Sequence, residues 1–351
     1  MQTGLRPSQT PDSGAPAEAV SPQAGPIQAG SPADHLTPRQ ADRLGQLSRL
    51  SGHLVVALVA LVVIGGATRV MQAGLACPDW PLCYGVLLPG RQMNLQVFLE
   101  WFHRLDAFVV GVALLVMAAA SLVGRRQLPG WLPWASGLAL ALVAVQGGLG
   151  ALTVTRLLAS SMVTAHLAAA LSLLALLSGL HQALKLQQAL KRHSQPGTAP
   201  LERPWRLVWG LAVCAALLLV FCQSLLGAWM ASHWAADRCL AAGDDCRWLL
   251  LHRQLAPAAG GAVLAVAALA ALCPALPRST RLLALGGALL VVAQLVLGVT
   301  TLRLALAVPA VTIAHQLGAA LLVAVLAGLL GQLPGLAGRP PSTSPSPSPL
   351  S

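Results

Sequence analysis

Two stretches of this chain share an order of residues that decides its fold. Residues 146–174 read QGGLGALTVTRLLASSMVTAHLAAALSLL, and residues 294–323 read QLVLGVTTLRLALAVPAVTIAHQLGAALLV. Each begins with a glutamine, continues through a glycine-bearing helix end, a threonine and an arginine, and reaches a histidine after a short link. Such self-similarity is the mark of an internal repeat. The sequence therefore predicts one structural unit that is present twice.

The spacing of four histidines extends this repeat. His103 and His166 are 63 residues apart, and so are His252 and His315. The first histidine of each pair is followed by an arginine and opens an apolar run, in the segments FHRLDAF and LHRQLAP. Each copy of the unit thus places histidines on two different helices.

The composition is that of a membrane protein. Of the 351 residues, 56% are hydrophobic and only 9% are charged, whereas soluble domains average about 25% charged residues. A helix needs roughly 20 apolar residues to cross a bilayer, and irregular backbone cannot face lipid. Eight runs meet this requirement: residues 50–68, 104–123, 131–151, 163–184, 207–230, 252–273, 281–301 and 309–331.

These runs predict an all-α integral membrane protein with eight transmembrane helices arranged as two tandem four-helix bundles. Because each unit has an even number of spans, both copies insert the same way up. A pseudo-twofold axis along the membrane normal would then relate them. The expected segments are a disordered tail at 1–47, a first bundle at 48–184, a linker at 185–206, a second bundle at 207–333 and a disordered tail at 334–351.

The distribution of positive charge predicts the orientation. Fourteen of the 22 lysines and arginines precede the first run, follow the last, or lie in alternate connections, and the other eight lie on the opposite side. By the positive-inside rule both termini are cytoplasmic. The net charge of +11 thus orients a multi-pass protein in the plasma membrane and does not indicate nucleic-acid binding. All four paired histidines fall toward the outer face.

Paired imidazoles on facing helices of a bundle are a common way to hold a haem iron from both sides. Ionisable residues inside membrane helices are costly and tend to mark function. A zinc site would want further N, S or O ligands in each cluster. A single histidine at a helix mouth is usually an interfacial polar residue, but four at one depth in two equally spaced pairs favour two bis-histidine haem sites.

Arginines accompany these histidines on the outer side. A haem carries two propionates, and the planar guanidinium fork matches a carboxylate. The alternative is that these arginines are anchors that snorkel to the membrane surface. The candidates for propionate binding are Arg69, Arg104, Arg156, Arg253 and Arg303.

Two cysteine pairs lie in outer loops at equivalent places of the two units. Because that side is oxidising, we expect the disulfides Cys77–Cys83 and Cys239–Cys246. A redox-active role of the first pair is an alternative to a structural one.

The segments GGATRVMQAGLACPDWPLC, EWFHRLDAFVVG, QGGLGALTV, VTAHLAAAL, LHRQLAPAAGG and AHQLGAALL together resemble the haem A synthase family. The resemblance runs from about residue 50 to residue 333. It implies an oxidoreductase that converts haem O to haem A for cytochrome oxidase, oxidising a ring methyl to a formyl group by successive hydroxylations. It also implies haem O synthase and a membrane electron acceptor as partners, besides the bilayer. A homo-oligomer is left open.

The resemblance assigns different roles to the two histidine pairs. It implies that His252 and His315 hold a b-type haem (iron protoporphyrin IX) as cofactor, and that His103 and His166 receive the substrate haem. A carboxylate matching Glu100 is implicated in catalysis in that family.

The residues themselves support this asymmetry. Glu100 lies three residues before His103, so both share one helix face, whereas Leu249 occupies the equivalent place before His252. We therefore expect chemistry in the first half, with Glu100 as proton acceptor or as a stabiliser of positive charge. The alternative for Glu100 is an ion pair with Arg104 or an outer-loop arginine.

Two other functions fit a double haem-binding bundle. A di-haem electron-transfer cytochrome would favour histidines at two depths, one haem near each membrane face, and here all four lie toward one face. A haem-binding assembly chaperone without catalysis predicts that Glu100 is dispensable.

Overall fold

The computed structural model describes residues 37–192, 201–232 and 246–337. Within these ranges the chain is all-helical and has no strand, only an isolated bridge between Cys83 and Val86. The helices are α1 (Pro38–Val70), α2 (Leu95–Val123), α3 (Leu132–Thr155), α4 (Ser160–Arg192), α5 (Arg203–Ser232), α7 (Arg247–Leu272), α8 (Arg278–Arg303) and α9 (Pro309–Gly331), with short 3-10 turns at Gly90–Gln92 and Leu333–Ala337.

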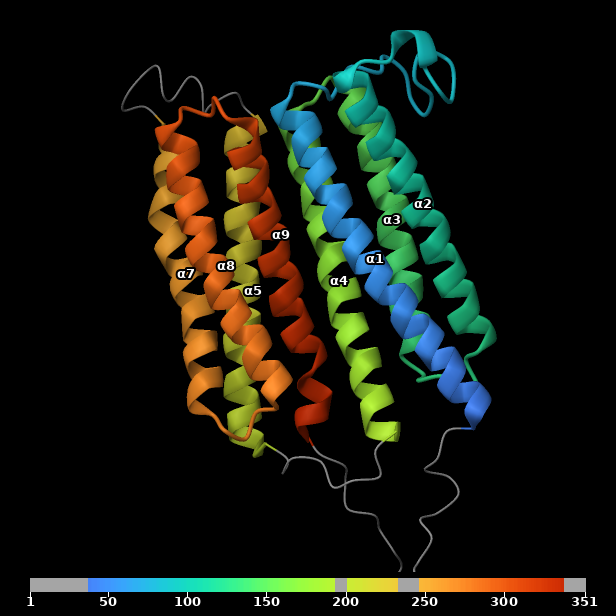
Figure 1. Cartoon of the computed structure of the whole chain (residues 1–351), viewed down its shortest axis with the longest axis vertical. Coiled ribbons are helices and arrows are strands. Elements are labelled where there is room, and N and C mark those ends of the chain that lie inside the picture. Colours follow the sequence, from blue (N-terminus) through green and yellow to red (C-terminus); the bar gives the residue numbers. More distant parts are fainter. Residues whose placement is uncertain (1–36, 193–200, 233–245, 338–351) are drawn as a thin grey trace, which may run out of the picture. The chain divides into compact units, whose positions relative to one another are not determined.

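Figure 1 shows the long helices running side by side, with α1 to α4 grouped together and α5, α7, α8 and α9 forming a second group. In the first group each helix packs against its chain neighbour and α1 also packs against α4. The second group repeats this ring, since α5 contacts both α7 and α9 and α8 contacts both α7 and α9. The groups meet mainly where α4 packs against α9. The predicted pair of four-helix bundles is confirmed, and the two-fold axis between them stays a prediction.

The packing explains which residues are buried. The largest buried side chains include Leu171, Leu174 and Leu177 of α4 and Leu326 and Leu329 of α9, so the core follows the two central helices. The outer helices bury one face, for example through Leu114 and Met117 of α2, and expose other large apolar side chains such as Phe108, as expected for helices that face lipid. Within the described residues eight helices are long and apolar enough to cross a membrane. The chain is a multi-pass membrane protein, as predicted.

Helix α1 begins earlier than the sequence suggested. The hydroxyl of Thr37 accepts from the backbone N–H of Gln40, and the Gln40 side chain accepts from the N–H of Thr37 at 3.0 Å. This reciprocal capping box, with proline at the first helical position, starts a helix whatever its polarity. The expectation that residues 38–47 belong to a disordered tail was therefore wrong. Likewise α4 continues to Arg192, into the expected linker.

The links before α4 and α9 share an unusual backbone. Leu157 and Leu158 have φ of 51° and 59°, and Ala305 and Leu306 have φ of 48° and 62°. Left-handed conformations are rare for residues other than glycine. The hydrogen bonds through the two links also follow one pattern, which agrees with the predicted repeat.

Some predictions lie outside the described residues. These are the tail segments 1–36 and 338–351, the centre of the linker at 193–200, and Cys239 in the loop before α7.

Candidate functional site

The loop between α1 and α2 is closed by a disulfide. Cys77 and Cys83 are bonded, with their Cα atoms 4.8 Å apart, and both are fully buried. This confirms the first predicted pairing. Cys246 lies at the start of α7, and the pairing with Cys239 stays a prediction.

Arg104 of α2 holds this loop in place. Its Nη1 donates to the carbonyl oxygens of Asp79 at 2.6 Å and Leu82 at 2.5 Å. Its Nη2 donates to the carboxylate of Glu100 at 2.5 Å and to the carbonyl of Cys77 at 3.5 Å. Both arms of the guanidinium are thus bound to the loop and to Glu100, which leaves Arg104 the least available of the predicted propionate ligands.

Glu100 is part of the same arrangement. It is only 4% exposed, and its second oxygen accepts from the backbone N–H of Cys77 at 2.8 Å. The carboxylate therefore joins α2 to the disulfide loop through one ion pair and one hydrogen bond. The ion pair with Arg104 is the alternative that the sequence left open for Glu100, and the structure contains it.

A second carboxylate organises the tip of the loop. Asp79 accepts from the backbone N–H groups of Tyr84 and Gly85, both at 2.7 Å. Tyr84 and Gly85 have φ of 56° and 73°, a turn in which successive N–H groups converge on an anion. The bond from Gly85, then that from Tyr84, lowers the pKa of Asp79 below its usual range. Asp79 was not among the residues predicted from the sequence, although the CPDWPLC segment in which it lies was an available signal.

One turn further along α2 from Glu100, His103 lies close to His166 of α4. Their ring centres are 6.4 Å apart and their planes are inclined by 67°. The Nδ1 atoms of both rings are buried and have no hydrogen-bond partner among the described residues. These are two imidazoles from opposite helices with unused nitrogen atoms, as the sequence predicted.

The separation of these rings fits one iron between them. An imidazole nitrogen binds a metal at about 2 Å and lies about 1 Å from its ring centre, so two rings on opposite sides of one ion have centres about 6 Å apart. The observed 6.4 Å agrees with this. The spacing of the His103 and His166 rings is therefore that of a bis-histidine iron site.

The second histidine pair lies on α7 and α9. His252 and His315 are close enough to interact electrostatically. The amide of Gln223 donates to the carbonyl of His252 at 2.7 Å and lies 3.1 Å from its Nδ1. Nδ1 of His315 donates to the carbonyl of Gln294 at 3.2 Å. The sequence did not predict these glutamine contacts. For Gln294 a signal was available, because a glutamine begins both repeat stretches.

The remaining predicted propionate-binding arginines lie near the same ends of the helices as the paired histidines. Arg253 of α7 and Arg303 of α8 line one open pocket of about 360 Å³ with Val299 and Leu302. Two cationic side chains at one apolar pocket could bind an apolar ligand that carries two negative groups on one edge.

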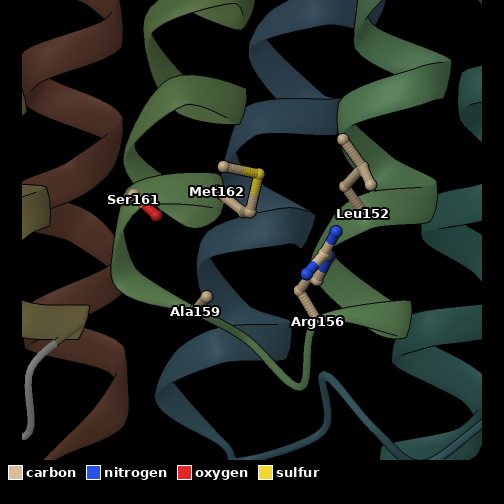
Figure 2. A pocket seen from close by; sticks show the side chains of 5 residues that line it. All are labelled: Leu152, Arg156, Ala159, Ser161 and Met162. Carbon is tan, nitrogen blue, oxygen red and sulfur yellow. The ribbon is translucent and has the colours of Figure 1, made fainter.

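In the first half, Arg156 ends α3 and lines an open pocket of about 300 Å³. Figure 2 shows it beside Leu152, with Met162 and Ser161 approaching from α4 and Ala159 in the link between the helices. Arg69, at the end of α1, has a buried Nη1 without a partner among the described residues. A buried unpaired guanidinium nitrogen is costly unless an anion meets it.

The fold and these sites define a class: a polytopic helical membrane protein in which each half carries two histidines on different helices, with arginines near the same helix ends. A family model described as cytochrome oxidase assembly protein, COX15-CtaA, matches residues 48–327. The chain belongs to this family.

Individual relatives agree with this. The chain is similar to proteins named heme A synthase from Sphingopyxis alaskensis, at 30% identity over 346 residues (84% of this chain, 93% of the relative), and from Caulobacter vibrioides, at 30% over 328 residues (78% and 92%). A shorter similarity connects it to protoheme IX farnesyltransferase 1 of Natronomonas pharaonis, at 35% over 130 residues, which is 37% of this chain and 26% of the relative.

Proposed function

We propose that this protein is a haem A synthase. It oxidises a ring methyl of haem O through two successive hydroxylations to a geminal diol, which loses water to give the formyl group of haem A. Each hydroxylation takes its oxygen from water and releases two protons and two electrons, and the electrons pass to a membrane electron acceptor. Family membership over residues 48–327 supports the assignment. The single structural observation that carries it is the opposed pair His103 and His166, whose ring spacing of 6.4 Å suits one porphyrin iron.

The two histidine pairs have separate tasks in this proposal. His103 and His166 bind the iron of the substrate haem O. His252 and His315 hold haem b, which supplies one-electron transfer when bound. The half with Glu100 carries the chemistry, because the second half has Leu249 at the equivalent position.

Glu100 acts next to the substrate as proton acceptor or as a fixed negative charge. Its two oxygens accept one bond from Arg104 and one from the Cys77 N–H, and a carboxylate can accept about four hydrogen bonds. Lone pairs therefore remain for a proton from the substrate side. Arg104 holds the carboxylate in a fixed position, which is the preorganisation that electrostatic catalysis requires.

The arginines bind the haem edges. Arg69, with its buried unpaired Nη1, and Arg156 are suited to the propionates of the substrate haem. Arg253 and Arg303, which share one pocket, are suited to those of haem b. Both termini are cytoplasmic and both haems lie toward the outer face. The partners are haem O synthase and a membrane electron acceptor.

The proposal is tested by extracting haem from membranes of cells that express the chain with a source of haem O. Chromatography should detect haem A with the wild type and none with His103→Ala. Glu100→Gln should retain bound haem O without forming haem A. Asp106→Asn, which changes another acidic residue of α2, is the matched control and should form haem A normally. Normal haem A from Glu100→Gln would refute the role of Glu100.

A haem-binding assembly protein without catalysis is the second candidate. It is favoured by one observation, that both oxygens of Glu100 have structural partners. It predicts bound haem O in the wild type, no haem A, and no change in haem content with Glu100→Gln. The same extraction therefore decides between the two functions.

A further inference from the structure

In the second half, each histidine lies against a glycine of the preceding helix. A Cβ placed on Gly298 of α8 would stand 2.9 Å from Cε1 of His315, and one on Gly227 of α5 would stand 3.0 Å from Cε1 of His252. Carbon atoms do not approach this closely without a shift. The two rings therefore occupy space that only glycine leaves open.

The first half repeats this arrangement. A Cβ on Gly65 of α1 would lie 2.8 Å from Cε1 of His103. A Cβ on Gly150 of α3 would lie 3.5 Å from Cε1 of His166, which is ordinary contact. In all four cases the nearest ring atom is Cε1, the carbon between the two nitrogens. We call these four positions, Gly65, Gly150, Gly227 and Gly298, the glycine notches.

A glutamine lies four residues before each notch of the second half. Four residues before Gly227 it is Gln223, whose side-chain amide nitrogen lies 3.1 Å from Nδ1 of His252. Four residues before Gly298 it is Gln294, and Nδ1 of His315 donates to its backbone carbonyl at 3.2 Å. In a helix this carbonyl already accepts from the N–H of the glycine. The histidine ring approaches the free side of this carbonyl oxygen through the space that a Cβ on the glycine would occupy.

The first half again follows the same spacing. Leu61 lies four residues before Gly65, and Gln146 lies four residues before Gly150. No ring–carbonyl hydrogen bond is formed here, because the Nδ1 atoms of His103 and His166 have no hydrogen-bond partner among the described residues.

A fifth histidine occupies a notch of the same form. Nδ1 of His181 on α4 lies 3.0 Å from the carbonyl of Ser48, four residues before Gly52 of α1, and a Cβ on Gly52 would lie 2.9 Å from Cε1 of this ring. His181 is not one of the paired histidines. The notch is thus a way to seat an imidazole between helices, and what distinguishes the other four is that they form two opposed pairs.

We propose that the glycine notches position the iron ligands, by fixing the place and plane of each imidazole. The inference rests on the proposed function, because it assumes that these histidines bind haem iron. For His315 the notch also admits the bond to the Gln294 carbonyl. That bond places the proton on Nδ1 and makes Nε2, which lies 3.5 Å from the side-chain amide nitrogen of Gln294, the unprotonated nitrogen that a metal would bind. It also raises the basicity of the ligand.

Alanine at Gly298 should displace the ring and break this bond. A less basic imidazole donates less electron density and stabilises ferric iron less, so the reduction potential of haem b should rise. We expect at least a tenfold change in the redox equilibrium constant, which is 59 mV for a one-electron couple. The low-spin EPR signal should shift as well, because it reports the planes of the two rings.

The experiment uses the purified full-length chain loaded with haem b, and compares Gly298→Ala with two controls. Gly286→Ala changes the same helix at a position where a Cβ meets nothing within 4 Å. Gly52→Ala introduces the same kind of overlap, against His181 instead of a proposed ligand. Gly227→Ala provides a second variant at the haem b pair.

The potential and the EPR signal should shift in Gly298→Ala and Gly227→Ala, or haem b should be lost from them, while both controls retain the wild-type spectrum. Equal shifts in Gly52→Ala would show that any packing defect has this effect, and would overturn the inference. So would an unchanged potential and EPR signal in both notch variants. A wild type that binds no haem would instead contradict the proposed function itself.

Discussion

Replacing Arg104 by methionine tests whether this one side chain holds the disulfide loop over the first histidine pair. Methionine keeps much of the apolar stem and removes every hydrogen bond of the guanidinium. The Cys77–Cys83 bond remains, so the chain stays tethered. The loop between the cysteines should nevertheless open far more often.

The free energy of loop opening can be estimated from the groups that lose their partner when Arg104 is replaced. The side chains of Arg104 and Glu100 are 15% and 6% exposed, so the pair is mostly buried. Removing one partner of a fully buried pair costs about 3 to 5 kcal/mol, and the lower end of this range applies here. The carbonyls of Asp79 and Leu82 also lose their short bonds. These losses do not add simply, because they share one side chain. We therefore expect about 3 kcal/mol for loop opening, or about a 100-fold faster exchange.

Amide hydrogen exchange measures this opening locally. The N–H groups of Cys83 and Val86 bond to each other's carbonyl oxygens across the loop and should lose about 100-fold of their protection in Arg104→Met. Arg253→Met is the matched control, since Arg253 is the equivalent residue of the second half and makes no hydrogen bond to any described residue. Unchanged protection in Arg104→Met would refute the reasoning.

Three further predictions concern the loop, the orientation and the junction of the two halves. The pKa of Asp79 is lowered in the folded loop, so ionised Asp79 stabilises the loop fully above the ordinary aspartate pKa of about 3.9, and this stabilisation is lost as the pH falls through the lowered value. Hydrogen exchange of the turn amides, corrected for intrinsic rates, should show this loss. Asp79→Asn should abolish the pH dependence. A membrane-impermeant maleimide should label Gly90→Cys but not Gly130→Cys in intact cells, both positions being open, and the reverse pattern would invert the topology. A Cβ on Gly331 would overlap the backbone of α4, so Gly331→Ala should lower the free energy of unfolding in detergent by about 1 to 3 kcal/mol, whereas an unchanged value would contradict the close contact.

Much of the fold was predictable because the membrane restricts the choices. Long apolar runs can only be helices there, and the equal spacing of His103–His166 and His252–His315 indicated the two units. The helix ends were less predictable, because outside the bilayer a local capping box such as Thr37 with Gln40 decides where a helix starts. Hydropathy does not register such signals.

The site was predictable to the level of residue type. The equal spacing of the histidines and the equivalent loop positions of the cysteines identified these residues. The proximity of His103 and His166 followed from the predicted topology. The sequence did not decide whether Glu100 and Arg104 bond to each other or face a ligand. Both arrangements are possible for two residues four positions apart on one helix. The glycine notches escaped notice because a glycine in a membrane helix is common, and only the three-dimensional contact shows which one seats a ring.

The most direct test of the central claim, that each half holds one porphyrin between two opposed imidazoles, is the haem content of purified variants. The wild type should contain low-spin haem b with two histidine ligands by EPR. His252→Ala should lose this haem, and His103→Ala should retain it. A wild type free of haem, or full haem b content in His252→Ala, would contradict the account.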